Sequence, residues 1–200
     1  FDKAQPDLNM HNPDVQEAML GEVEYWLKKG VKGLRLDAIN FLCHDLELRD
    51  CPVKSGTAGN SYSELEHIYD KNRPETLDFI RRLRKLTDQY PGAFMVGEIG
   101  DDNGMGIAKS YTNGDDLLHT AYNFSLFDRS LSAGYIKGVF EYYDGLPGDG
   151  YASWAISNHD VPRAASRWGG PDPDSARAKQ LNALLALLPG TVFMYQGEEL

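Results

Sequence analysis

Three short segments place a carboxylate at the end of an apolar run of strand length. The acids are Asp37, Glu98 and Asp160, so the intervals from 37 to 98 and from 98 to 160 are 61 and 62 residues. This spacing suits successive units of a (β/α) barrel, in which the C-terminal ends of several strands supply the active-site residues. Two or three convergent acids are also the groups that cleave a glycosidic bond. The pattern therefore predicts acid–base chemistry on a sugar.

The residues around two of these acids suggest different protonation states. Asp37 comes two residues after Arg35 in a strand, so both side chains point to the same side and can form an ion pair. Such a pair lowers the pKa of the carboxyl group and keeps it ionised, as a nucleophile requires. Glu98 has few charged neighbours, and an apolar setting raises the pKa of a carboxyl group, which suits a proton donor.

The third acid ends the run Asn158-His159-Asp160. Three polar side chains at one strand end can bind a polar ligand. The same residue types are also typical of a turn in which an asparagine side chain accepts a hydrogen bond from the backbone. The sequence alone leaves both interpretations open.

Helical and strand patterns alternate along the chain, which predicts an α/β fold. We expect helices over about 14–29, 74–90, 130–143 and 173–188, and strands over 31–36, 93–96, 117–124, 151–156 and 191–195. Between them, the polar stretch 40–73 predicts a functional or inserted loop. Five strands cannot close an eight-stranded barrel, so the pattern predicts an open sheet or the later part of a barrel. The start at Phe1, without Met, favours a piece of a longer protein.

The composition narrows the range of partners. The 200 residues are 42% hydrophobic, and 20 basic against 30 acidic residues give a net charge of -10. Without a basic cluster, nucleic acid and anionic membranes are not expected partners. No apolar run approaches the roughly 20 residues of a membrane span. Cys43 and Cys51 suit free thiols of a reducing compartment, so we expect a cytoplasmic protein. The histidines show no metal-binding spacing, and neither a metal nor a cofactor is predicted.

Five segments carry a family resemblance. GLRLDAINF (33–41) resembles the nucleophile motif of glycoside hydrolase family 13, the α-amylase family, VGEI (96–99) its acid/base motif and SNHD (157–160) its third-carboxylate motif. QPDLN (5–9) resembles the motif of the oligo-1,6-glucosidase and α-glucosidase branch, and 190–200 resembles the last barrel strand. The resemblance spans nearly the whole chain.

The resemblance implies a partial TIM (β/α)8 barrel. Residues 1–200 would form the C-terminal portion of the catalytic barrel, about strands 4 to 8 with their helices. The N-terminal strands, an inserted subdomain and a C-terminal β-domain are expected to lie outside this segment. The family's first motif, Asp-x-x-x-x-Asn-His, does not occur in this sequence.

The resemblance also implies a role for each matching residue. Asp37 would be the nucleophile, Glu98 the general acid and then base, and Asp160 the residue that holds sugar hydroxyls in an oxocarbenium-like transition state. His159 would help to bind these hydroxyls, and Arg35 would orient the nucleophile. The reaction would retain the anomeric configuration, with the two key carboxyl groups about 5 to 5.5 Å apart.

Two further residues are candidates for substrate binding. Phe124, at a predicted strand end, can stack on a sugar or pack in the core. Arg163, three residues after Asp160, can line the pocket or form a surface ion pair.

Ala38, directly after the expected nucleophile, bears on specificity. In this branch Val at that position tends to accompany α-1,6 cleavage, and Ala or Thr tends to accompany α-1,4 cleavage. The resemblance thus implies a retaining α-glucosidase that releases α-1,4-linked glucose from a small oligosaccharide or disaccharide such as maltose, with transglycosylation as an accompanying reaction. The alternatives are an α-1,6-specific or sucrose-acting relative, a non-catalytic scaffold or transporter partner, and an inactive truncated fragment.

Overall fold

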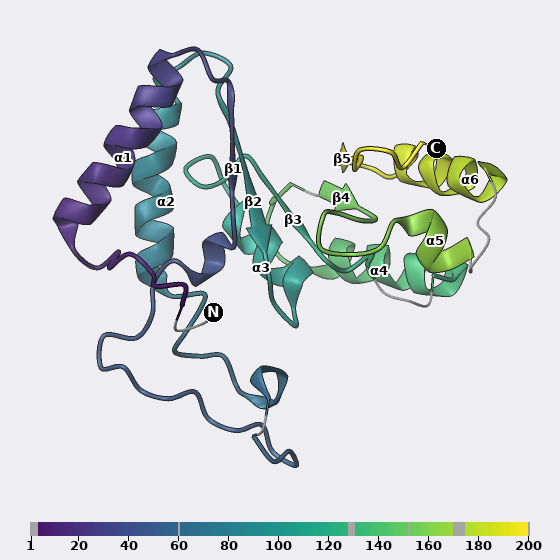
Figure 1. Cartoon of the computed structure of the whole chain (residues 1–200), viewed down its shortest axis with the longest axis horizontal. Coiled ribbons are helices and arrows are strands. Elements are labelled where there is room, and N and C mark those ends of the chain that lie inside the picture. Colours follow the sequence, from purple (N-terminus) through teal and green to yellow (C-terminus); the bar gives the residue numbers. More distant parts are fainter. Residues whose placement is uncertain (1–3, 60, 128–130, 152, 170–174, 200) are drawn as a thin grey trace. The chain divides into compact units, whose positions relative to one another are not determined.

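The computed structural model describes residues 4–59, 61–127, 131–151, 153–169 and 175–199. It comprises two compact units, Phe1–Met95 and Val96–Leu200, which are treated separately below (Figure 1).

The first unit contains two long helices that the sequence predicts. Helix α1 (Pro13–Lys28) begins where the Asn12 side chain accepts a hydrogen bond from the Asp14 N–H at 2.9 Å. This bond satisfies one of the backbone donors that a helix start leaves unpaired. Helix α2 (Pro74–Thr87) also begins with a proline, and it packs beside α1 (Figure 1). The boundaries predicted from the sequence are confirmed to within three residues.

Helix α2 buries more of its residues than helix α1 does. Helix α2 contributes a row of buried residues, Thr76, Phe79, Ile80, Leu83 and Thr87. In α1, the one buried residue is Leu27, and Trp26 is 52% exposed although it is apolar. The Trp26 ring contacts the Tyr25 ring edge to face, with 5.4 Å between the ring centres.

Strand β1 (Gly33–Leu36) follows α1, and it pairs with the beginning of β2 (Phe94–Ile99), where the Phe94 N–H donates to the Lys32 carbonyl at 2.9 Å. After β1 come a 3₁₀ turn, η1 (Ile39–Phe41), and a long excursion that contains a second, η2 (Tyr62–Glu64). The two ends of this excursion lie next to each other, because the Asn72 N–H donates a hydrogen bond to the Asn40 carbonyl at 2.7 Å. The predicted loop is therefore closed at its base.

The second unit contains two parallel strand pairs. The rest of β2 pairs with β3 (Thr120–Asn123), with Glu98 opposite Tyr122. Strand β4 (Ser153–Ala155) pairs with β5 (Thr191–Phe193). The pairs adjoin, since the Ser153 hydroxyl donates to the Ala121 carbonyl of β3 at 2.5 Å. Parallel strands joined through helices are the units of a (β/α) barrel.

Four helices accompany these strands: α3 (Gly104–Tyr111), α4 (Ala133–Gly145), α5 (Ala164–Gly169) and α6 (Ser175–Ala186). The sequence predicted α4 and α6, apart from residues 130 and 173–174, which lie outside the described residues. It did not predict α3 or α5, and it interpreted 101–106 as a turn. The core of this unit consists of Leu126, Val139, Trp154, Ile156, Ala164, Leu181 and Leu185.

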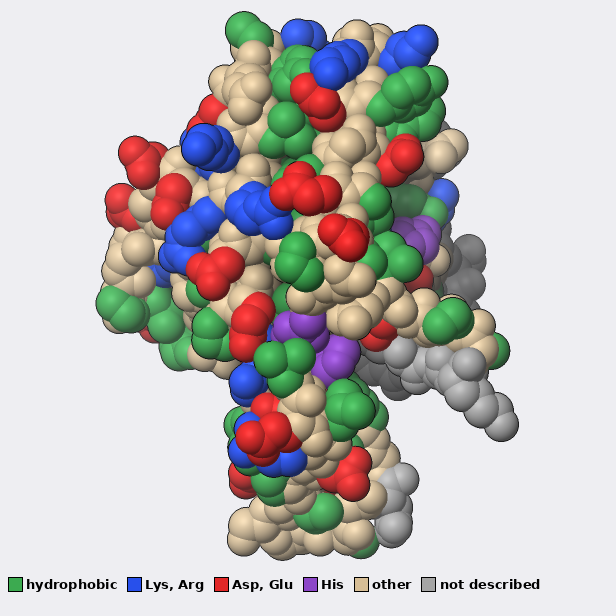
Figure 2. All heavy atoms as spheres, turned by 90° about the vertical axis from the view of Figure 1, so that its left-hand side faces the viewer, with side chains coloured by type: hydrophobic (Ala, Val, Ile, Leu, Met, Phe, Trp, Pro, Cys, Tyr) green, Lys and Arg blue, Asp and Glu red, His purple; other side chains and the backbone are tan. Residues whose placement is uncertain are grey.

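The surface agrees with the composition. Figure 2 shows Lys and Arg side chains interspersed with Asp and Glu over the face of the first unit that carries α1. Lys28 pairs with Glu24 at 2.9 Å, and Arg82 pairs with Glu17. This face lacks the continuous basic stripe typical of nucleic-acid binding. Among the described residues, no helix is both long enough and apolar enough to span a bilayer.

Candidate active site

Asp37 lies directly beyond the C-terminal end of β1, at the position predicted for it. The Arg35 guanidinium donates a hydrogen bond to Asp37 Oδ1, as expected for side chains two residues apart in a strand. The Asp37 side chain is 73% exposed. An exposed carboxylate with a fixed cationic neighbour is suited to nucleophilic attack.

The residue directly after this acid adopts a left-handed backbone conformation. Ala38 has φ 41° and ψ 41°, in the left-handed region that L-residues other than Asn and Asp seldom occupy. The turn ends the extended strand and begins η1, which continues into the buried Ile39 and Asn40. Ala38 therefore determines how sharply the chain turns away from Asp37.

A cavity of about 390 Å³ adjoins this turn within the first unit. Arg35 and Asp37 line it, together with Asp7 and Leu8 of the QPDLN segment. The rest of its wall is mostly apolar and includes Met19, Val23, Phe79 and Leu83. Concave sites with apolar walls and a few polar groups are typical of small-molecule binding. The structure thus brings the nucleophile motif and the QPDLN motif to one cavity.

In the second unit, Glu98 lies inside β2, one residue before its end, and not after the strand as the sequence suggested. Its residue exposure is 7%. The alternation of a strand puts it on the same side as Val96, which packs with Tyr122 and Ala155. The Glu98 residue is therefore largely shielded from solvent, and the apolar setting of its carboxyl group stays a prediction.

Asp160 lies five residues beyond the end of β4, in a turn organised by Asn158. The Asp160 N–H donates to Asn158 Oδ1 at 2.9 Å, and Asn158 Nδ2 donates back to the Asp160 carboxylate at 3.4 Å. His159 Nε2 lies 3.5 Å from Asp160 Oδ1. Both side chains are more than 60% exposed, so the turn presents a carboxylate and an imidazole together.

Sequence reasoning gave no role to Glu198, which the structure places beneath this turn. Glu198 is 3% exposed; its carboxylate accepts a hydrogen bond from the Ser157 hydroxyl, and the Ala164 N–H approaches it at 3.5 Å. The Asn182 side chain of α6 donates to the Glu198 carbonyl. The signal in the sequence is an acid placed directly after Gly197 at the end of the last strand.

Arg163 also connects the segments that follow β4 and β5. Its guanidinium donates to the Gln196 carbonyl and lies 5.0 Å from the centre of the Tyr195 ring. The φ of Gly197 is 80°, and a Cβ there would come within 3.0 Å of the same guanidinium. Arg163 thus braces the turn after β5, and its role in substrate binding stays a prediction.

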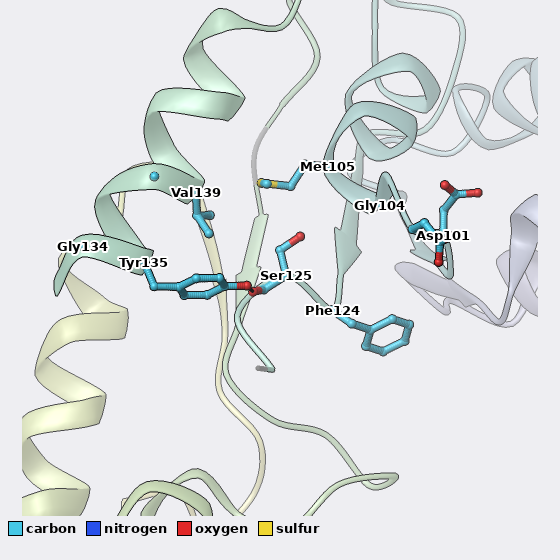
Figure 3. A pocket seen from close by; sticks show the side chains of 10 residues that line it. Asp101, Gly104, Met105, Phe124, Ser125, Gly134, Tyr135 and Val139 are labelled. Carbon is cyan, nitrogen blue, oxygen red and sulfur yellow. Dashed lines mark hydrogen bonds between the residues drawn. The ribbon is translucent and has the colours of Figure 1, made fainter. Parts of the chain in front are cut away.

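Phe124 follows β3 directly and lines a second cavity of about 610 Å³, between α3 and α4 (Figure 3). In Figure 3 its ring points away from Tyr135, whose hydroxyl donates to the Ser125 carbonyl at 2.5 Å. The ring meets Tyr122 and Phe127 edge to face, at 6.1 and 5.2 Å. At 36% exposure, one side of the ring is packed and the other remains accessible, so both interpretations of Phe124 stay open.

Comparison with known proteins places this arrangement in a family. The model of the α-amylase catalytic domain matches residues 1–200. The chain belongs to the α-amylase family. A probable alpha-glucosidase of Rhizobium meliloti (strain 1021) is 47% identical over 212 residues, which cover all of this chain and 38% of that protein. Maltase 1 of Drosophila virilis is 37% identical and covers all of this chain and 33% of its own length.

A solved structure supports the same assignment. The alpha-glucosyl transfer enzyme XgtA superposes with a TM-score of 0.92 at 43% identity, over 99% of this chain and 38% of that enzyme. This chain thus spans between a third and two fifths of the length of these relatives. Its parallel strands and helices are part of a TIM barrel, as the sequence predicted. The individual roles of Asp37, Glu98 and Asp160 stay predictions.

Proposed function

We propose that the protein carrying this chain is a retaining α-glucosidase that releases terminal α-1,4-linked glucose from small α-glucosides such as maltose. The observation that carries the proposal is the Asp37–Arg35 pair at the end of β1, on the wall of an apolar cavity that it shares with the QPDLN segment. Two relatives that cover the whole chain, named probable alpha-glucosidase and Maltase 1, support the choice of substrate class.

The proposed reaction has two steps. Asp37 Oδ attacks C1 of the terminal glucose while the Glu98 carboxyl group gives its proton to the departing glycosidic oxygen, so one C–O bond forms as the other breaks. Glu98, now a carboxylate, then removes a proton from water, whose oxygen attacks C1 and releases Asp37. Asp160 and His159 bind sugar hydroxyls and strengthen these contacts in the transition state.

The test uses the complete polypeptide that carries this chain. We expect maltose to be hydrolysed faster than isomaltose or sucrose, and the first product seen by NMR to be α-glucose. Asp37→Asn should abolish turnover. Glu98→Gln should lower kcat on maltose by about 10²- to 10⁴-fold, and the loss should be smaller on an aryl α-glucoside, whose leaving group needs little protonation.

Three results would contradict the proposal. β-Glucose as the first product would refute the retaining mechanism. Faster cleavage of isomaltose than of maltose would favour the α-1,6-specific alternative. A polypeptide that is folded by circular dichroism but turns over none of the three sugars would favour a non-catalytic scaffold or an inactive fragment.

A second candidate function is glucosyl transfer to an acceptor alcohol or sugar, which the likeness to the alpha-glucosyl transfer enzyme XgtA favours. In this reaction a hydroxyl group replaces water in the second step. Adding an acceptor such as glycerol at increasing concentration should divert glucose into a new glucoside. A product ratio that does not change with acceptor concentration would exclude this function.

A further inference from the structure

The excursion between β1 and α2 contains a short antiparallel ladder. The Lys54 N–H donates to the Glu64 carbonyl and the Glu66 N–H to the Pro52 carbonyl, both at 2.7 Å, on either side of a bridge between Val53 and Leu65. In such a register, residues two positions further along each arm are again opposite each other. The ladder therefore brings Cys51 opposite His67.

Asp70 completes a three-residue cluster at the open end of this ladder. The Cys51 Sγ, one ring nitrogen of His67 and one carboxylate oxygen of Asp70 all lie within 4.8 Å of one another. The His67 side chain is 6% exposed and stacks on the Tyr62 ring, with 3.8 Å between the ring centres. Asp70 Oδ1 is buried without a hydrogen-bond partner. An imidazole with a fixed orientation and a carboxylate thus lie close to a thiol.

The contacts of the His67 ring indicate which atom would bind a ligand. Nε2 lies 2.8 Å from the Tyr62 carbonyl, to which it donates its hydrogen. Nδ1 lies 2.8 Å from Asp70 Oδ2. A histidine that binds a metal usually donates its other ring N–H to a carboxylate, a backbone carbonyl or water, and the Tyr62 carbonyl is such an acceptor for Nε2. Neither nitrogen is left to take the proton of the Cys51 thiol, which argues against a cysteine nucleophile activated by His67.

We propose that Cys51, His67 and Asp70 bind a divalent transition-metal ion, with Zn²⁺ as the preferred metal. The ion takes the place of the hydrogen between His67 Nδ1 and Asp70 Oδ2, and the Cys51 thiol binds as a thiolate. The displaced proton and the thiol proton both go to solvent. A mixed set of sulfur, nitrogen and oxygen suits Zn²⁺, whereas Ca²⁺ and Mg²⁺ take oxygen ligands. Three protein ligands leave the fourth tetrahedral position to water.

Such a site would tie the excursion together. The ladder itself comprises few residue pairs, and a two-stranded ribbon of this size is only marginally stable in water. A metal bound at its open end would link both arms to the segment that leads into α2. Metal binding would thus order the excursion independently of the reaction proposed above.

The experiment uses the complete polypeptide, freed of metal with a chelator and titrated with Co²⁺ and then Zn²⁺. We expect Co²⁺ to produce a thiolate-to-metal charge-transfer band in the near ultraviolet, and Zn²⁺ to abolish it at one equivalent per chain. Cys51→Ser should remove the band, and His67→Gln should weaken Zn²⁺ binding in calorimetry by at least about tenfold.

Cys43 provides the matched control, because it is the other cysteine of the chain and is a buried free thiol. Burial raises the pKa of the Cys43 thiol, which disfavours the thiolate that a metal requires. Cys43→Ala should therefore leave the cobalt band unchanged. If the parent protein gives no band, or if the band survives in Cys51→Ser, the proposal is wrong. Should Cys51→Ser not fold, equal Zn²⁺ affinity in His67→Gln and the parent protein would overturn it.

Discussion

The left-handed turn at Ala38 leads to a prediction about how Asp37 is held. An L-residue in this conformation costs about 1–2 kcal/mol, and glycine avoids that cost. Glycine also loses about 0.5–1 kcal/mol more backbone entropy on folding. Ala38→Gly should therefore raise the free energy of unfolding by about 0.5 kcal/mol. Ala38→Val, which puts a β-branched residue at φ 41°, should lower it by at least about 1 kcal/mol.

The assay is urea unfolding of the complete polypeptide, compared with the same substitutions at Ala93. Ala93 is a half-buried residue before β2 and is not among the described residues with positive φ. At Ala93 the glycine variant should be less stable than the valine variant. Ala93→Gly should lower the free energy of unfolding by about 0.5–1 kcal/mol, and Ala93→Val should change it by less than about 0.5 kcal/mol. This change of sign separates backbone conformation from side-chain size.

Activity gives an independent measurement. A shift of about 1 Å in a reacting group can cost about 100-fold in rate, so Ala38→Val should lower kcat on maltose by about 10- to 100-fold. The reasoning is refuted if Ala38→Gly is less stable than the parent while Ala38→Val is equally stable. A rise of the isomaltose-to-maltose rate ratio without a stability change would instead mean that Ala38 acts through contact with the sugar.

Three more predictions concern stability and use the same unfolding assay. Gly150→Ala should lose about 1–3 kcal/mol, because its Cβ would come within 2.2 Å of the Lys109 carbonyl oxygen; unchanged stability would mean that this contact relaxes freely. Leu185→Ala should lose about 2–5 kcal/mol, since Leu185 is fully buried, and a loss under 1 kcal/mol would contradict its place in the core. The bidentate Arg49 guanidinium lowers the pKa of Asp45 to about 2, so this pair stabilises the fold above the ordinary aspartate pKa. That stabilisation should be lost as the pH falls from about 4 towards 2, and Asp45→Asn should flatten this part of the pH profile.

The sequence predicted the elements whose local signals agree with their packing. Helices α1 and α2 have a starting proline and apolar residues at helical spacing, and both were found. Helix α3 was missed because it is eight residues long and contains Gly104 and Gly106, which favour turns. Its formation depends on distant contacts, such as Lys109 Nζ donating to the Leu146 carbonyl at 2.8 Å.

Parts of the candidate site could likewise be predicted from the sequence, and other parts could not. The Arg35–Asp37 contact could be predicted because it depends only on the two-residue period of a strand. The cluster of Cys51, His67 and Asp70 could not, because it depends on the register of a loop ladder that no motif marks. The cavity beside Asp37 also depends on helix packing, since residues of α1 and α2 form part of its wall.

The contacts of Glu198 affect how this barrel can be recombined with its relatives. One buried residue, Glu198, joins three segments: its carboxylate contacts Ser157 before the Asp160 turn and the Ala164 N–H at the start of α5, and its backbone carbonyl accepts from Asn182 of α6. A chimera with a junction between Ser157 and Glu198 would combine two halves of this hydrogen-bond network from different parents. A junction before β4 keeps this network within one parent, so such a junction is the better choice when segments are exchanged among members of the α-amylase family.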